Sequence, residues 1–494
     1  SMTQPAKTNT NGSNSRFAFF KNFFQPGNNS LGYLLIIMSA IIWFEGKNLR
    51  SMNIFLLIIV IFWVFVKILE KTNLFTNQKD GFRKPNKRRK LKLLSLILVF
   101  LLISVFFATI IVVNYAEDFG GNPSNHNSPN YKDGMFENTE QTDLQSEDVS
   151  SWDLFTDYLV SDDCRSPNQD LPAQKFESLE VEPGQISVSW FGHSTILMES
   201  SSLTIITDPV FSDSGAGPLS IGPQPFPYEQ SYEIEDLPTI DYVFISHDHY
   251  DHLDMDTVKK LKNSEFFVPL GIKNHLLEWG VDEENIIELD WYDEIEVSNE
   301  LDIAFTPSRH FSGRGFGDSH ATLWGSWVFN FHNFSIYFSG DTGYMDEFKN
   351  ISQLYGPFDL AFLDSGQYNL AWRQVHMLPE EVVQAGIDLN ASVILPIHIS
   401  KYELALHHWF EPLEMVSKLG LERNLSVATP MLGSSFILGE EVPQDPWWRD
   451  VWECSGPFLD DYPMIEYALF YTGSIGGFWI AIPMFAKNKF KEEE

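Results

Sequence analysis

Cysteine is nearly absent from this chain, with two residues, Cys164 and Cys454, among 494. Neither belongs to a Cys-x-x-Cys motif, which argues against a thiolate metal site. In an oxidising compartment the two cysteines could pair, whereas in a reducing one they would stay as thiols. The sequence leaves both readings open.

Positive charge is scarce after residue 114. The chain carries 33 basic and 67 acidic residues, for a net charge of -34. Its first 114 residues hold 15 of the basic and 3 of the acidic residues, so the remainder has 18 basic and 64 acidic residues. Such an acidic region repels nucleic acid and anionic headgroups. We therefore expect no nucleic-acid partner.

Long uncharged runs lie near both ends of the chain. Leu93–Val113 has no charge in 21 residues, and a bilayer core needs about 20, so a transmembrane helix is predicted there. The shorter runs 31–44 and 54–69 favour a helical hairpin. The basic cluster at 83–92 is predicted to be cytoplasmic by the positive-inside rule, which makes the region after the helix extracytoplasmic. The run at 467–486 is either another span or an apolar hairpin packed on the domain.

These features divide the chain into four predicted parts. Residues 1–114 form a membrane region with up to three transmembrane helices, and 115–184 form a polar linker and lead-in. The stretch 114–151 is rich in Asn, Ser, Gly, Asp and Glu, which predicts a flexible linker. Residues 185–440 form the main folded domain, and 441–494 form a C-terminal extension.

The main domain alternates β-rich runs with helical patterns, which predicts an α/β fold. Helices are expected at Asp256–Leu261 and at Pro379–Leu389, where proline and two glutamates mark the first turn. Strands are expected at Ile186–Trp190, Leu203–Thr207, Tyr242–Ser246, Ile303–Thr306, Ser335–Phe338 and Val393–Leu395.

One short segment concentrates the chemistry. His247, His249, Asp251 and His252 form an H-x-H-x-D-H pattern directly after the strand at 242–246. Neutral imidazole and carboxylate groups suit zinc and similar divalent cations, and such a cluster is costly unless a cation binds it. The sequence therefore predicts a metal site on a loop at the end of a strand.

Three further candidates each follow a predicted strand. They are His310, Asp341 and His398. Each is a weak signal alone, but strand ends on one edge of a sheet converge, so we expect the three to join the 247–252 loop.

This pattern resembles the metallo-β-lactamase superfamily and, within it, the N-acyl-phosphatidylethanolamine-hydrolysing phospholipase D family with its bacterial relatives. The resemblance runs from about 185 to 440 and leaves out the membrane segments. It rests on Trp190–Ser194, Thr207–Phe211, Ile245–Asp254, Leu323–Trp327 and Ser339–Tyr344.

The resemblance implies an αββα sandwich with two divalent metal ions, most often zinc, at one edge. His247, His249 and His310 would hold one ion, Asp251, His252 and His398 the other, and Asp341 would bridge them. Asp251 and Asp341 would therefore be catalytic. In the phospholipase relatives a metal-bridging hydroxide attacks phosphorus and releases the N-acylated headgroup.

Other residues are expected around the ions. Asp208 and His193 would orient the ligands. An acidic segment at 364–369 replaces a less polar one in the animal enzymes, and an acid beside the pocket would disfavour an anionic lipid. Substrate contacts are expected from His376, His408, Arg309 and Gln367, whereas Arg314 is expected to be an ordinary surface residue.

The sequence thus predicts a membrane-anchored, dinuclear metal-dependent phosphodiesterase acting on N-acyl-phosphatidylethanolamine-like lipids, with an apolar rim beside the metals. One alternative is a metal-dependent lactonase or hydrolase of a soluble substrate. Another is a metal-stabilised membrane module that binds a partner without catalysis. Neither the metal nor the oligomeric state follows from the sequence.

Overall fold

The computed structural model divides the chain into two compact units, Ser1–Tyr115 and Ala116–Glu494. The predicted spans at 31–44, 54–69 and 467–486 lie outside the described residues, as does nearly all of 93–113. No helix in the described part is long and apolar enough to cross a membrane. The described residues are Ser95, Leu98, Leu101 and the ranges 116–122, 126–146, 149–150, 164–220, 222–315 and 317–451.

Two mixed sheets of seven strands each form the centre of the second unit. The first has the order β16-β3-β4-β5-β6-β7-β8 and the second β15-β14-β13-β12-β11-β10-β9. Strands β5 to β8 run parallel, as do β12 to β15. The bounds in the first sheet are β3 Ser187–Trp190, β4 Ile196–Glu199, β5 Thr204–Thr207, β6 Tyr242–Phe244, β7 Glu265–Pro269, β8 Ile286–Leu289 and β16 Ser435–Ile437. Those in the second are β9 Glu294–Ser298, β10 Leu301–Thr306, β11 Ser326–Phe331, β12 Phe334–Phe338, β13 Phe358–Asp364, β14 Ala391–Ile397 and β15 Ser426–Val427.

The strands are apolar on both faces because both faces are covered. In β12, Ile336 and Phe338 join the core between the sheets, whereas Tyr337 joins the core beneath the helices. In β13, Leu360 likewise joins the core between the sheets, and Leu363 joins the core beneath the helices. This two-residue period follows from the alternation of side chains along a strand.

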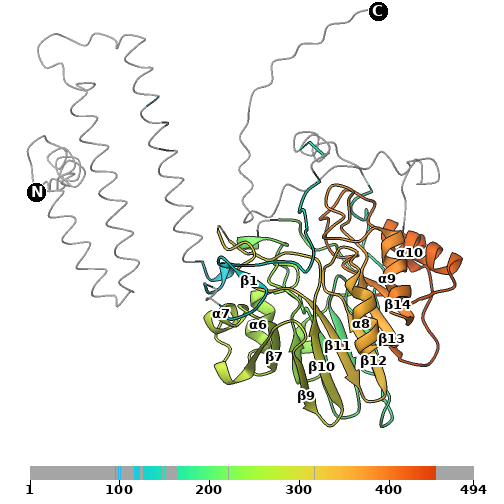
Figure 1. Cartoon of the computed structure of the whole chain (residues 1–494). Helices are drawn as coiled ribbons and strands as arrows, with labels where there is room; N and C mark the ends of the chain where they lie inside the picture. Colours follow the sequence, from blue (N-terminus) through green and yellow to red (C-terminus); the bar gives the residue numbers. More distant parts are fainter. Residues whose placement is uncertain are drawn as a thin grey trace, which may run out of the picture. The chain divides into compact units, whose positions relative to one another are not determined.

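Helices cover the two outer faces of the sandwich (Figure 1), α6 and α7 on one side and α8, α9 and α10 on the other. Helix α9 begins with Pro379, and the Glu381 side chain accepts from the Leu378 N–H at 2.9 Å, which satisfies a free donor of the first turn. The bounds are α6 Met255–Leu261, α7 Lys273–Glu278, α8 Glu347–Tyr355, α9 Pro379–Asp388 and α10 Glu411–Glu422. Short 3-10 turns are η1 Glu117–Phe119, η2 Pro218–Ser220, η3 Ile234–Asp236, η4 Glu283–Asn285 and η5 Trp447–Asp450.

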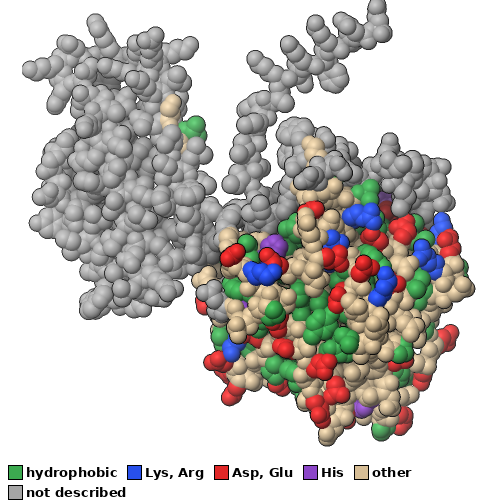
Figure 2. All heavy atoms as spheres, in the orientation of Figure 1, with side chains coloured by type: hydrophobic (Ala, Val, Ile, Leu, Met, Phe, Trp, Pro, Cys, Tyr) green, Lys and Arg blue, Asp and Glu red, His purple; other side chains and the backbone are tan. Residues whose placement is uncertain are grey.

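The α/β sandwich and the six predicted strands are confirmed, each within a few residues of its expected bounds, as are the helices at 256–261 and 379–389. Acidic side chains are spread over the face of this unit shown in Figure 2, as the charge balance implies. Cys164 is buried, and Cys454 lies outside the described residues.

Residues 126–146, which we call the strap, differ from the flexible linker that was predicted. The strap forms a two-stranded hairpin, β1 Tyr131–Lys132 and β2 Met135–Phe136. It folds onto the domain because Phe136 is buried in the core between the sheets, and its N–H donates to the His320 carbonyl at 2.7 Å. The polar composition of this segment gave no sign of the docking, because few apolar residues, mainly Phe136, Tyr131 and Leu144, take part in it.

Candidate metal centre

The candidate residues converge at the carboxyl ends of strands from both sheets. Asp208 follows β5, the 247–252 loop follows β6, His310 follows β10, Asp341 follows β12 and His398 follows β14. Gly340 allows the close approach of Asp341, because a Cβ at Gly340 would lie 2.6 Å from that of Ser246, and its φ is +56°. The edge of the sandwich therefore carries one compact cluster.

The first half-site consists of His247, His249 and His310 together with Asp341. Its ring nitrogens face one another: His249 Nδ1 lies 2.9 Å from His247 Nε2 and 3.3 Å from His310 Nε2. Asp341 Oδ2 is 3.7 Å from both His247 Nε2 and His310 Nε2. Four buried or half-buried donor atoms thus surround one point.

The second half-site consists of Asp251, His252 and His398, again with Asp341. Asp341 Oδ1 lies 3.2 Å from His252 Nε2, and Oδ2 lies 3.3 Å from His398 Nε2. Asp251 Oδ2 lies 3.4 Å from His398 Nε2 and 3.6 Å from His252 Nε2. All seven residues predicted as ligands therefore lie together, with Asp341 between the two sets.

Two atoms that face each other across the centre have no hydrogen-bond partner. His252 Nε2 and Asp341 Oδ1 are buried and form no hydrogen bond with any described residue. Although His252 Nε2 and Asp341 Oδ1 are 3.2 Å apart, their orientation does not make a hydrogen bond. Buried polar atoms left in this way are costly, and divalent cations satisfy imidazole nitrogen and carboxylate oxygen together. The clustered groups fit a dinuclear metal site.

Asp208 and His193 contact the second half-site. His252 Nδ1 donates to Asp208 Oδ2 at 2.7 Å, so Asp208 orients this ring as predicted. His193 Nε2 instead donates to Asp251 Oδ2 at 2.9 Å, so it contacts a carboxylate rather than an imidazole. His193, Asp208 and His398 all have positive φ, between 37° and 64°, which non-glycine residues rarely adopt and which functional sites often hold.

Asp364 is a partner that the sequence reasoning missed. His398 Nδ1 donates to its Oδ1 at 3.1 Å, and His376 Nδ1 donates to its Oδ2 at 3.0 Å. The Thr342 N–H also donates to Asp364, at 3.0 Å. This buried carboxylate is therefore shared by two histidines and is not the free acid that was expected to repel a lipid. Asp364 lies at the end of β13, and this position in the sequence could have identified it as a candidate.

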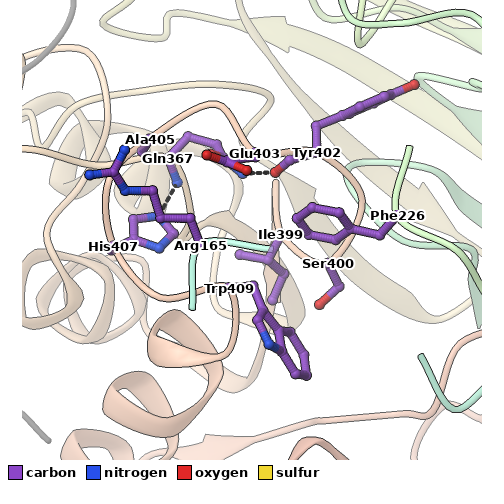
Figure 3. Close-up of a pocket in the computed structure, with 10 residues that line it drawn as sticks. All are labelled: Arg165, Phe226, Gln367, Ile399, Ser400, Tyr402, Glu403, Ala405, His407 and Trp409. Atoms are coloured by element: carbon purple, nitrogen blue, oxygen red, sulfur yellow. Dashed lines mark hydrogen bonds between the residues drawn. The ribbon is translucent and has the colours of Figure 1, made fainter. Parts of the chain in front are cut away.

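His376 lies at the cluster, whereas Gln367 and His408 do not. Gln367 lines a pocket together with Ile399, Tyr402 and other residues of the segment that follows His398 (Figure 3). Its side-chain amide donates to the Tyr402 carbonyl at 3.1 Å and to the His398 carbonyl at 3.4 Å, so it supports that loop. The His408 ring lies near Phe410, with ring centroids 5.5 Å apart, and joins none of the metal-binding groups among the described residues.

The two arginines are used in protein contacts. Arg309 donates to Thr142 Oγ1 at 3.0 Å and to the Gln141 carbonyl at 2.8 Å. Its guanidinium group therefore binds the strap, where a contact with the substrate was expected. Arg314 was expected on the surface but is 1% exposed. It donates to the carbonyls of Asp248 and Leu253, both at 2.8 Å, and so fixes the backbone of the metal-binding loop.

The two half-sites differ in their electrostatics. Burial lowers the pKa of His247, His249 and His310. Burial also opposes protonation of His252 and His398, but the neighbouring carboxylates outweigh it, raising the pKa of His252 well above its usual value and that of His398 to about 10.

A separate apolar cluster lies beside the first half-site. The Phe311 ring packs on His249, with centroids 4.7 Å apart, and on His310 at 4.6 Å. Phe311 belongs to a group with Trp372 and Val375, against which Leu144 of the strap packs. The sequence offers five aromatic candidates for an apolar rim: Phe311, Phe316, Trp324, Trp372 and Trp409. Phe311 packs on the histidines and Trp372 belongs to the same cluster, whereas Trp324 and Trp409 belong to the core between the sheets and Phe316 lies outside the described residues.

Comparison with known proteins shows which family this chain is similar to. Residues 204–399 match the beta-lactamase superfamily domain. An uncharacterized protein of Mycobacterium tuberculosis is 40% identical over 65% of this chain and 88% of its own length. A Caenorhabditis elegans protein named N-acyl-phosphatidylethanolamine-hydrolyzing phospholipase D 1 is 34% identical over 52% of this chain and 75% of its own length. A solved metallo hydrolase from Ignicoccus hospitalis aligns with a TM-score of 0.40 and 21% identity, covering 52% of this chain and 100% of that one.

Proposed function

This chain belongs to the metallo-β-lactamase superfamily as a metal-dependent hydrolase, and from that premise we propose that it hydrolyses phosphodiester lipids of the N-acyl-phosphatidylethanolamine type. The observation that carries the proposal is the pair of His/Asp groups at the sheet edge, with the Asp341 carboxylate within 3.7 Å of histidines of both. We further propose that the run Leu93–Val113 anchors the enzyme to the membrane that holds its substrate.

The seven residues at the sheet edge would hold two divalent ions. Two such ions polarise a phosphoryl oxygen and lower the pKa of a nearby water molecule. Asp341 holds the two half-sites in one fixed relation because its two oxygens face histidines of both. Asp251 takes a hydrogen bond from His193, which leaves the orientation of its carboxylate fixed toward His398. We assign Asp251 and Asp341 as the catalytic carboxylates on this basis.

His376 is the residue best placed to contact the substrate. Its Nδ1 is held by Asp364, so Nε2 is the ring nitrogen that can reach a substrate oxygen. Its ring stacks on His398 with centroids 5.0 Å apart, and its side chain is 12% exposed. The buried Phe311 cluster makes the protein beside the first half-site apolar, which suits an acyl chain better than a small polar substrate.

Purified full-length protein in mixed micelles should convert N-acyl-phosphatidylethanolamine to phosphatidic acid and an N-acylethanolamine. A chelator should abolish the reaction and zinc should restore it. A generic phosphodiester and a panel of lactones serve as comparison substrates. Turnover of lactones with none of the lipid would refute the lipid proposal and favour the soluble-substrate alternative. If His249→Ala and Asp341→Asn fold correctly and leave every measurable activity unchanged, the non-catalytic module would be favoured.

A further inference from the structure

The strap crosses the edge of the sandwich at His310. The Asn138 side chain bonds both backbone groups of this residue: Nδ2 donates to the His310 carbonyl at 2.8 Å, and the His310 N–H donates to Oδ1 at 3.1 Å. Trp324 Nε1 also donates to Oδ1, at 3.0 Å. Because the backbone N–H and the carbonyl of His310 both bond to the Asn138 side chain, the position and the orientation of the His310 backbone are fixed.

His310 depends on such support more than the four ligands of the 247–252 loop do. The 247–252 loop holds four ligands in one short segment that Arg314 fixes, whereas His310 stands alone on the loop after β10. The His310 ring itself has one hydrogen bond to a neutral group, from Nδ1 to the Val375 carbonyl at 3.1 Å. The preceding residue, Arg309, is bound to the strap as well. The strap therefore holds two consecutive residues of this loop.

We propose that Asn138 is a positioning residue for the first half-site, so that a segment before the residues that match the superfamily domain, 204–399, completes the metal centre. The inference rests on the metal centre proposed above. Asn138 touches no ligand side chain and acts through the His310 backbone, which sets where His310 Nε2 stands. Binding of the metal and docking of the strap are then linked, and each stabilises the other.

The test is a zinc titration of the metal-free full-length protein. The variants His310→Ala and His398→Ala identify which binding step belongs to which half-site. Asn138→Ala should weaken the His310 step by about tenfold, the low end of the effect of removing an outer partner of a ligand. The other step should stay within about twofold. Asn127→Ala, an exposed asparagine of the same strap, is the matched control and should bind both ions as the parent does.

Three results would overturn the inference. Asn138→Ala could bind both ions as tightly as Asn127→Ala, or it could weaken both steps equally, or it could lower the melting temperature of the metal-free protein with no change in either step. If Asn138→Ala does not fold, Asn138→Asp is tested in its place, with the same expected and contradicting results. This variant keeps an oxygen that accepts from Trp324 and from the His310 N–H, but it loses the N–H that donates to the His310 carbonyl. A parent protein that takes up no zinc would instead refute the proposed metal centre itself.

Discussion

The two half-sites share Asp341 but are supported in different ways. In the second, buried carboxylates hold the outer nitrogens of two histidines: Asp208 holds His252, and Asp364 holds His398. In the first, the corresponding partners are neutral, the Ser246 hydroxyl for His247 and a backbone carbonyl for His310. A carboxylate partner makes an imidazole a stronger donor to a metal. We therefore expect the second half-site to fill first.

The pKa shifts point in the same direction. Burial lowers the pKa of the first half-site's histidines, whereas carboxylates raise the pKa of His252 and His398 against burial. A group of carboxylates that stabilises an imidazolium also stabilises a divalent cation in its place. The second half-site is thus electrostatically prepared for a cation, and the first depends on geometry, including that provided by the strap.

Asp341→Asn should have the largest effect because this residue serves both half-sites. We expect both zinc-binding steps to weaken and activity to fall by more than about 100-fold, the upper range for loss of an outer partner. Isothermal titration with zinc and a lipid turnover assay measure the two effects. If one step keeps its affinity, Asp341 does not bridge the half-sites.

Asp208→Asn should selectively weaken the second half-site, by up to about 100-fold. Asp208 is buried and also accepts from the Ser246 N–H at 2.7 Å and from its hydroxyl at 2.5 Å, so one amide oxygen cannot replace both carboxylate oxygens. Exposed Asp213→Asn is the control. Equal weakening of both steps would erase the distinction between the half-sites.

Asp364→Asn should weaken the same half-site by about tenfold, and it should also raise KM because His376 loses the partner of its Nδ1. The combined effect distinguishes this residue from Asp208, which contacts no residue that we assign to the substrate. Exposed Asp346→Asn is the matched change. A fall in metal affinity with unchanged KM would separate His376 from substrate binding.

Arg309→Lys should have the smallest effect on the metal centre. It loses hydrogen bonds to the strap, so we expect a loss of about 1–2 kcal/mol in the free energy of unfolding, with activity per folded molecule within about threefold of the parent. Chemical denaturation measures the loss, and Arg373→Lys on the exposed surface provides the comparison. A fall in turnover without loss of stability would restore Arg309 to a substrate role.

The sequence predicted much of this site because the information was local. The H-x-H-x-D-H segment follows one strand, and single histidines and aspartates follow others. Because the carboxyl ends of parallel strands lie at the same edge of a sheet, these side chains were expected to meet there. Asp208 was predictable for the same reason. Asp364 stood at a strand end too, but its role was misjudged because the two histidines that donate hydrogen bonds to it become its neighbours only in the folded chain.

The role of the strap was not predictable in this way. Asn138 lies 172 residues before His310, and an asparagine in a polar segment gives no periodic signal. Phe136 and Tyr131 pack on the core between the sheets and Leu144 packs on the Phe311 cluster, but these three residues are too widely spaced to form a periodic apolar pattern. Arg309 was assigned to a phosphate for the same reason, since its actual partners, Gln141 and Thr142, lie in a segment that was expected to be unstructured.

The most direct test of this account is the metal content of the purified full-length chain after metal removal and reconstitution with zinc. The account predicts two equivalents per chain, bound in two steps, with the tighter step lost in His398→Ala and the weaker step lost in His310→Ala. A correctly folded chain that retains no zinc, or one in which both variants lose the same single step, would contradict it.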